Sequence, residues 1–176
     1  MIDIETLGTA IDTTVLTIGA IKFDLLGNEL VDQQFESFYV RVDIDSCDRL
    51  GLTSSDETLA WWAKQTPEAQ DEAFSSGDRV SIEEALQQLH KFCWNCSTVW
   101  SNGATFDIVI LEYIYRKLNK SPPWNYYDIR CVRTLFNMGI NPKMPKETAH
   151  NALIDSYYQA IGVQNVMREL TTAVKS

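Results

Sequence analysis

The first forty residues consist of apolar runs separated by short polar breaks, a pattern typical of β-strands. Residues 1–5 correspond to the end of a strand, residues 14–23 are rich in β-branched side chains, and a third run ends at residues 38–40. The pair Gly27-Asn28 is a turn signal between the second and third runs. We therefore expect these three segments to form an antiparallel meander.

Helical patterns dominate the rest of the chain. Ser54 and Glu57 have capping-box spacing before an apolar segment, as do Ser81 and Glu84, and Pro67 can occupy the first position of a helix between them. Further along we expect a short strand and three helices, at residues 98–100, 106–118, 131–138 and 151–170. Three strands followed by helices and short strands indicate an α/β or α+β domain with one sheet.

Acidic side chains interrupt these patterns, and functional sites are expected where residue type and local pattern conflict. Asp3 and Glu5 share one face at the end of the first strand, because the side chains of a strand point alternately to opposite faces. Asp107 stands at the start of a helix that is apolar nearly all round. Each signal alone is weak, since acids are common on exposed strand faces and in the first turn of a helix.

A third signal is the pair His150 and Asp155. In one regular helix their side chains would point about 140° apart. They can converge if His150 lies in the preceding loop, Asn151 caps the helix and Asp155 reaches in from its beginning. The alternative is a histidine that has no connection with Asp155.

Taken together, these residues have a specific chemical meaning. Four carboxylates in one place would repel one another and shift each other's pKa values. Mg²⁺ and Mn²⁺ prefer oxygen ligands, and two such ions about 3.5–4 Å apart can stabilise the attacking and leaving oxygens of a phosphodiester. A histidine can orient or deprotonate water near neutral pH. The combination predicts metal-dependent cleavage of phosphodiester bonds.

The charge balance at first counts against a nucleic-acid partner. The chain has 15 Lys and Arg against 24 Asp and Glu, a net charge of −9, and phosphates repel a negative body. The distribution weakens this objection, because Asp128 is the only acid among seven basic residues in the segment 116–146. That segment is either a phosphate-facing surface or an ordinary solvated face. Its basic residues are Arg116, Lys117, Lys120, Arg130, Arg133, Lys143 and Lys146.

The composition, 45% hydrophobic and 22% charged, is that of a globular protein. No apolar run approaches the roughly 18 residues of a membrane span, and the start has no signal-peptide pattern. We therefore expect a cytoplasmic protein without a membrane partner. Cys93 and Cys96 form a C-x-x-C near the end of a predicted helix, where the dipole disfavours a thiolate. We expect the four cysteines to be ordinary buried thiols.

Three segments resemble, in order, the three motifs of the DEDDh superfamily of 3′-5′ exonucleases. They are Asp3-Ile4-Glu5-Thr6-Leu7-Gly8, Asn102 with Phe106-Asp107, and His150 with Asp155. The resemblance implies an α/β, ribonuclease H-like fold, with a central mixed sheet of about five strands flanked by helices, in a single domain over residues 1–176. The phage and prophage exonuclease/exoribonuclease branch is the most similar, because of the aromatic segments at residues 61–62, 100–103 and 123–126.

The resemblance also implies roles for these residues. Asp3, Glu5 and Asp155 would bind a first divalent ion, Mg²⁺ or Mn²⁺. Asp3 would also contact a second ion, and Asp107 would hold the metals through water. His150 would be the general base, and it is counted with Glu5 as catalytic.

The substrate implied by the resemblance is the 3′ end of RNA or single-stranded DNA, released as nucleoside 5′-monophosphates. The backbone of Thr6, the side chain of Leu7 and Phe106 would meet that end. One departure is Cys131, at a place where many relatives carry an acid. The choice between RNA and DNA stays open, as does a homodimer, since dimers occur among relatives.

Two other functions compete with the exonuclease. A nuclease-like binding module would bind strands without turnover, and a ribonuclease H-type endonuclease would make internal cuts. Trp61 and Trp62 could supply a platform for base stacking, but adjacent helical residues point about 100° apart, so at most one would face a substrate. We expect core packing for both.

Overall fold

An antiparallel meander begins the fold, as the sequence predicts. The computed structural model describes residues 1–28, 30, 34–138 and 150–175. In the meander, β2 (Val15–Ile21) lies between β1 (Ile2–Thr6) and β3 (Ser37–Val42) and is antiparallel to both. β4 (Arg79–Val80) pairs in parallel with β3 and makes this four-stranded sheet mixed.

A second sheet has two parallel strands, β5 (Val99–Ser101) and β6 (Ile129–Cys131). The structure therefore has a four-stranded and a two-stranded sheet in its described residues, where the sequence led us to expect one sheet of about five strands. β5 lies near β1 without joining its ladder. At this open edge of β1 the backbone N–H of Ile4 donates to the carboxylate of Asp107 instead of to a strand.

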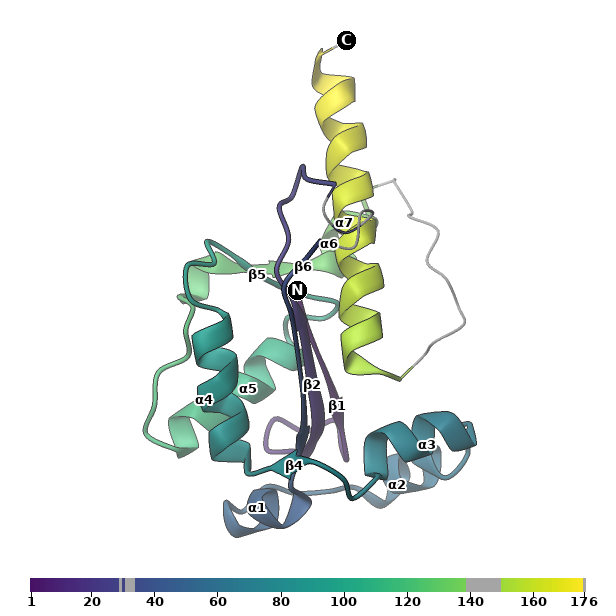
Figure 1. The fold of residues 1–176 in the computed structure, drawn as a ribbon, viewed down its shortest axis with the longest axis vertical. Coiled ribbons are helices and arrows are strands. Elements are labelled where there is room, and N and C mark those ends of the chain that lie inside the picture. The colour runs from purple at the N-terminus through teal and green to yellow at the C-terminus, as the bar shows by residue number, and fades with distance from the viewer. Residues whose placement is uncertain (29, 31–33, 139–149, 176) are drawn as a thin grey trace.

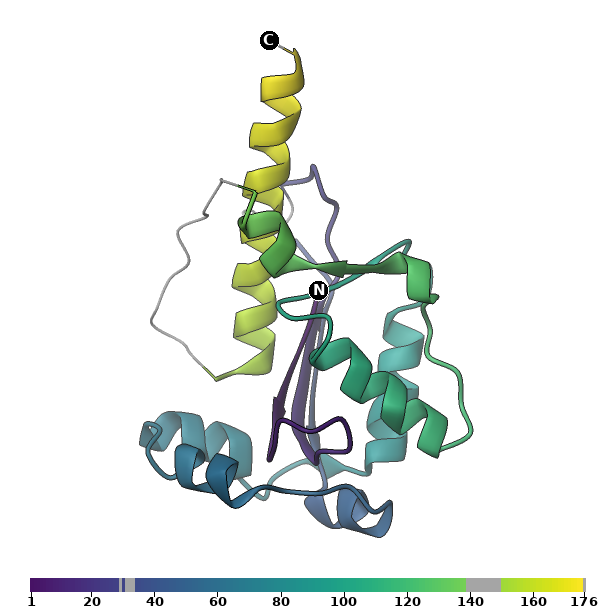
Figure 2. The same cartoon turned by 180° about the vertical axis from the view of Figure 1, so that it is seen from behind.

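Helices cover both faces of the four-stranded sheet. Figures 1 and 2 show α4 and α5 on one side of it, α7 on the other, and α2 with α3 beyond one end of the strands. All seven residues of β2 are buried in consequence. The helices are α1 (Ile44–Arg49), α2 (Asp56–Trp62), α3 (Pro67–Phe74), α4 (Ile82–Phe92), α5 (Asp107–Lys117), α6 (Val132–Phe136) and α7 (Ala152–Lys175), with a 3₁₀ turn at Tyr126–Asp128.

Local capping rules fix most helix starts. The hydroxyl of Ser81 accepts the N–H of Glu84 at 3.2 Å, and Pro67 is the first residue of α3, as expected. The prediction that Ser54 caps the helix that became α2 is wrong by one residue. Ser55 is the cap, because its own N–H donates to the carbonyl of Leu7 and keeps the chain extended up to that point.

The sheet packs against separate apolar clusters. Side chains of β1, β2 and β3 meet α4 and α5 in one cluster, while Trp100 and α6 meet α7 in a second. A third cluster attaches α2 and α3 to the sheet; its buried members are Leu7, Leu16, Trp62, Ala69 and Ala73. We call residues 56–74, which contain α2 and α3, the α2–α3 arm.

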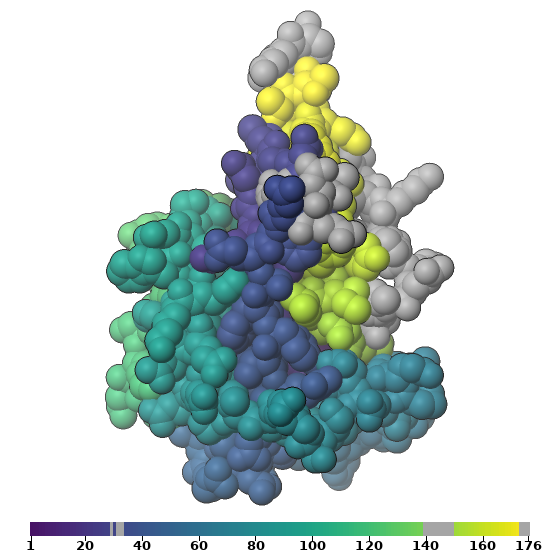
Figure 3. Space-filling model, in the orientation of Figure 1, coloured from purple at the N-terminus to yellow at the C-terminus, as the bar shows by residue number. Residues whose placement is uncertain are grey.

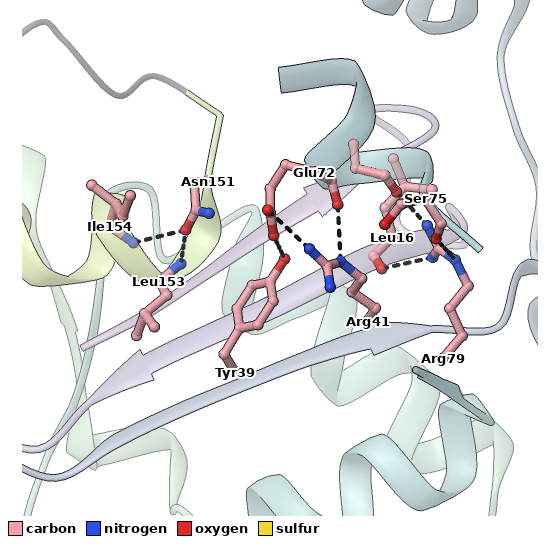
Figure 4. Close-up of polar contacts among 10 residues, drawn as sticks. Leu16, Tyr39, Arg41, Glu72, Ser75, Arg79, Asn151, Leu153 and Ile154 are labelled. Atoms are coloured by element: carbon pink, nitrogen blue, oxygen red, sulfur yellow. Dashed lines mark hydrogen bonds and ion pairs between the residues drawn. The ribbon is translucent and has the colours of Figure 1, made fainter. Parts of the chain in front are cut away.

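Polar contacts also fix the α2–α3 arm to the sheet. Glu72 of α3 accepts a hydrogen bond from the hydroxyl of Tyr39 and forms a 2.9 Å ion pair with Arg41, both on β3. Arg79 donates to the carbonyl of Ser75 at 2.8 Å and to that of Leu16 at 3.4 Å (Figure 4). A partly buried network with this many partners holds the arm in one position.

The cysteines and the helices bear on two further expectations. All four cysteines are free, but only Cys47 is fully buried, and Cys96 is exposed because α4 ends at Phe92 and the chain turns outward. The expectation of buried thiols is therefore wrong for Cys96. Burial raises the pKa of Cys93 to about 12, as in an unreactive thiol.

Within the described part of the chain, no helix has the length and apolarity to cross a membrane.

Candidate functional site

Three carboxylates from the two ends of the chain converge. Asp3, Glu5 and Asp155 each offer an oxygen atom, and these atoms all lie within 4.8 Å of one another. Asp3 and Glu5 share one face of β1, while Ile2, Ile4 and Thr6 are buried on its other face. Asp155 belongs to the beginning of α7. We call these three side chains the acidic cluster.

A glycine lets α7 approach the acidic cluster. Gly19 of β2 is the ladder partner of Asp3, and a Cβ atom on Gly19 would lie 2.2 Å from the carbonyl carbon of Ala152. The hydroxyl of Ser156 donates to the carbonyl of Gly19 at 3.1 Å. This role of Gly19 was not predicted from the sequence, although an isolated glycine within a strand pattern signals a close backbone approach.

His150 and Asp155 converge as expected for a histidine in the loop before a helix that Asn151 caps. His150 precedes α7 in a left-handed conformation with φ of 76°, and its N–H donates to Asp155 Oδ2 at 3.1 Å. Asn151 caps the helix, since its Oδ1 accepts the N–H groups of Leu153 and Ile154 at 3.1 and 3.0 Å (Figure 4). The backbone of His150 thus fixes one oxygen of Asp155.

The tandem tryptophans lie beside this histidine. The rings of Trp61 and His150 are 4.7 Å apart and nearly perpendicular, and Trp62 is 5.9 Å from the same ring. Trp62 is buried and donates to the carbonyl of Thr6 at 2.9 Å. Trp61 is 41% exposed, so the expectation that both pack in the core is wrong for Trp61. Figure 3 shows the α2–α3 arm next to α7 on the molecular surface.

Asp107 lies beside the acidic cluster. It is the first residue of α5, only 4% exposed, and its Oδ1 accepts the N–H of Ile4 at 3.3 Å. Ile4 lies between Asp3 and Glu5 in the strand. The carboxylate of Asp107 therefore contacts the edge of β1 at the residue between these two acids. The structure thus brings all four predicted metal ligands together, with Asp107 outside the group of three.

The acidic cluster is electrostatically unfavourable without a cation. Burial, then Asp107 and Glu5, hold the pKa of Asp3 well above its usual range. Burial, with Asp155 and Asp107, raises the pKa of Glu5 to about 8. Burial also raises the pKa of Asp107 to about 6, although backbone hydrogen bonds oppose the shift, and it raises that of Asp155. An oxygen-rich, partly buried group with this charge fits Mg²⁺ or Mn²⁺.

The predicted substrate-binding residues flank these carboxylates. Thr6 and Leu7 directly follow Glu5 and are buried, and Thr6 Oγ1 donates to the carbonyl of Gly8 at 2.7 Å. Leu7 packs on Trp62 in the third cluster and is 5% exposed, which leaves only its edge for a ligand. Phe106 is partly buried and precedes Asp107.

Arg133 of the basic segment lies beside the loop that leads to Asp107. A Cβ atom on Gly103 would lie 3.4 Å from Arg133 Cζ, and the positive charge of Arg133 opposes the rise in the pKa of Asp107 that burial causes. Arg133 is exposed and has no carboxylate within ion-pair distance among the described residues. Lys117 donates to the carbonyl of Gly51, and Lys120 donates to the carboxylate of Glu83. Lys143 and Lys146 lie outside the described residues.

A buried glutamine contacts the acidic cluster and was not expected from the sequence. Gln159 Nε2 donates to Asp3 Oδ1 at 2.9 Å. Its position four residues after Asp155, on the same face of a helix, is the signal that could have revealed it.

Two comparisons with known proteins show a similarity to exonucleases. The profile of the family described as 3′-5′ exoribonuclease Rv2179c-like domain matches residues 1–167. A protein of Enterobacteria phage T4 described as exodeoxyribonuclease is 26% identical over 159 residues, which covers 74% of this chain and 68% of the phage protein.

Proposed function

The chain belongs to the family of Rv2179c-like 3′-5′ exoribonuclease domains, and on that premise we propose that it is a metal-dependent DEDDh exonuclease with a ribonuclease H-like fold in a single domain. The observation that carries the proposal is the convergence of Asp3, Glu5 and Asp155 within 4.8 Å. A structural role alone would not gather three partly buried carboxylates whose charges oppose folding.

Each carboxylate has a part in holding two divalent ions, Mg²⁺ or Mn²⁺. Asp3, Glu5 and Asp155 would ligate the first ion and Asp3 also the second. Asp107 would act through water, in keeping with its position outside the group of three. When bound, the ions would stabilise the attacking and leaving oxygens of the phosphodiester.

His150 is the general base of the proposed reaction. A histidine ring can take a proton from the attacking water near neutral pH, and it requires a fixed position to do so. Two features support this role: the N–H of His150 is tied to Asp155 Oδ2, and the ring rests against Trp61. The proton would pass from the water to the His150 ring as the water oxygen attacks the phosphorus atom, and the bond from phosphorus to the 3′ oxygen of the preceding nucleotide would break.

The proposed substrate is the 3′ end of RNA or single-stranded DNA, and the product is a nucleoside 5′-monophosphate. The backbone of Thr6 would meet the terminal hydroxyl, with the edge of Leu7 and Phe106 against the last bases. The family description names an exoribonuclease and the phage relative is an exodeoxyribonuclease, so both nucleic acids are candidates.

A digestion ladder tests this function. Matched RNA and DNA strands, single and double, labelled at either end, are incubated with Mg²⁺, Mn²⁺ or a chelator. We expect stepwise shortening from the 3′ end, release of mononucleotides and no reaction with chelator. Asp155→Asn should abolish the reaction, whereas Asp71→Asn, which removes an exposed carboxylate on α3, should not.

Other results would contradict the proposal in distinct ways. Internal cuts would indicate a ribonuclease H-type endonuclease. Strand binding without any product under both metals would indicate a binding module.

A further inference from the structure

Gln159 is a buried polar side chain whose amide points at the acidic cluster. It is 6% exposed, and its Nε2 donates to Asp3 Oδ1 at 2.9 Å. Among the described residues, Gln159 is the side chain that donates a hydrogen bond to the carboxylate of Asp3. Gln159 is one helical turn beyond Asp155, so α7 supplies both a carboxylate and the partner of another carboxylate.

We propose that Gln159 is a positioning residue of the metal centre, an inference that rests on the proposed function. By occupying Oδ1 of Asp3, it fixes the rotation of the carboxylate and leaves Oδ2 free to bind a cation. An amide is suited to this task because it donates a hydrogen bond without adding a positive charge that would repel the metal.

The hydrogen-bonding capacity of Gln159 supports this assignment. With a cation bound, Asp3 is ionised and only accepts hydrogen bonds, so the amide must present its nitrogen to Asp3. The Oε1 atom is then left buried without a partner among the described residues. A buried unpaired carbonyl is unfavourable, and a residue that served only to fill the core would be better replaced by an apolar side chain.

The placement of α7 makes this contact rigid. Ser156 donates to the carbonyl of Gly19, and Gly19 is the ladder partner of Asp3. The helix is therefore fixed to the strand next to Asp3 between the positions of Asp155 and Gln159. A shift of α7 would displace a ligand and the support of a second ligand together.

The test compares two glutamines of the same helix. Gln164 is also buried and donates its amide to the backbone carbonyl of Asp24, away from the acidic cluster. Mn²⁺ binding is measured by calorimetry for the wild type, Gln159→Met and Gln164→Met, and thermal melts are recorded with Mn²⁺ and with chelator. Loss of a residue that orients a metal ligand typically weakens metal affinity by about 10- to 100-fold.

We expect this loss for Gln159→Met, with a smaller rise of Tm on adding Mn²⁺, and affinity within about twofold of wild type for Gln164→Met. Gln159→Leu, which also lacks the donor, should repeat the result. Wild-type affinity in both Gln159 variants would overturn the inference. Failure of both to fold, with Gln164→Met folded, would also overturn it by assigning Gln159 to core packing.

Asp3→Asn separates this inference from the proposed function. If Asp3→Asn abolishes Mn²⁺ binding and the Gln159 variants do not weaken it, the positioning role fails while the metal centre stands. If Asp3→Asn binds Mn²⁺ as the wild type does, the metal centre itself is refuted.

Discussion

Gly19 and Ala152 are in direct backbone contact, so close that a Cβ atom on Gly19 would lie 2.2 Å from the carbonyl carbon of Ala152. This contact places α7 against β2 next to Asp3, and it brings Asp155 close to Asp3 and Glu5. The position of the whole site thus depends on one missing side chain in the middle of a buried strand.

Gly19→Ala should therefore lower both stability and metal affinity. The added methyl group cannot be accommodated by a flexible side chain, because its neighbours are backbone atoms. Overpacking of this kind costs about 1–3 kcal/mol or more of unfolding free energy, measurable by urea denaturation. Gly77→Ala is the matched control, since a Cβ there meets nothing within 4 Å. Equal effects of the two substitutions would show that the contact does not position α7.

His150→Asn should reduce kcat by about 10²- to 10⁴-fold, the usual contribution of a general base. Asparagine tolerates the left-handed conformation that His150 adopts, so the backbone contact to Asp155 should survive. Mn²⁺ affinity should consequently stay close to wild type. His90→Asn, at the second of the two histidines, is the control and should be fully active. Unchanged kcat in His150→Asn would exclude this histidine as the base.

In the absence of divalent cations, the protein should become less stable as the pH rises from about 4.5 to about 8. Burial and the neighbouring carboxylates raise the pKa of Glu5 from 4.5 to about 8. Between these values the folded protein binds more protons than the unfolded chain, so raising the pH favours unfolding by up to about 1.4 kcal/mol per pH unit for this group.

Saturating Mn²⁺ should remove this dependence, because the cation takes the place of the protons. Denaturation curves at several pH values, with and without Mn²⁺, measure the effect. Glu5→Gln should flatten the slope of the metal-free protein. A metal-free stability that increases over this range would contradict the electrostatics described for the acidic cluster.

Trp61→Ala should weaken binding of a single strand. Trp61 is 41% exposed beside His150, and base stacking on an aromatic ring contributes about 1–3 kcal/mol per base, which corresponds to roughly a 5- to 150-fold rise in KM. Trp61→Phe should retain much of the affinity. Trp94→Ala removes a more exposed indole beyond the end of α4 and should leave KM unchanged. A fall in kcat alone would instead indicate that Trp61 serves only to hold the His150 ring.

Arg133→Glu should raise KM and reduce the salt dependence of log KM by about one unit of slope, as expected for the loss of one phosphate contact. The exposed guanidinium lies against Gly103 at the start of the loop to Asp107. Lys91→Glu, an equal charge reversal on α4, should have little effect. If KM depends on salt in the same way in both variants, Arg133 does not contact phosphate and the basic segment is an ordinary solvated face.

The sequence was sufficient wherever a short-range rule decides the structure. Strand alternation places Asp3 and Glu5 on one face, and the capping preference of Asn151 explains how His150 and Asp155 converge. The motif order then connects these segments with Asp107 before any contact is known.

Features that depend on distant partners were beyond such rules. The helix starts after Ser55 and not Ser54 because of a hydrogen bond to Leu7. β5 remains outside the ladder of β1, where Asp107 occupies the N–H of Ile4. The spacing of Gln159 from Asp155 places both on one face of α7, but its contact with Asp3 depends on how α7 crosses the sheet.

The hydrogen bond between Asp3 and Gln159 joins residues 156 positions apart. A ribosome adds about 5–20 residues per second, so roughly 8 to 30 seconds separate the synthesis of the first strand from that of the last helix. For nearly all of this interval the growing chain lacks both Asp155 and His150. The proposed metal centre therefore cannot assemble until the beginning of α7 has been synthesised.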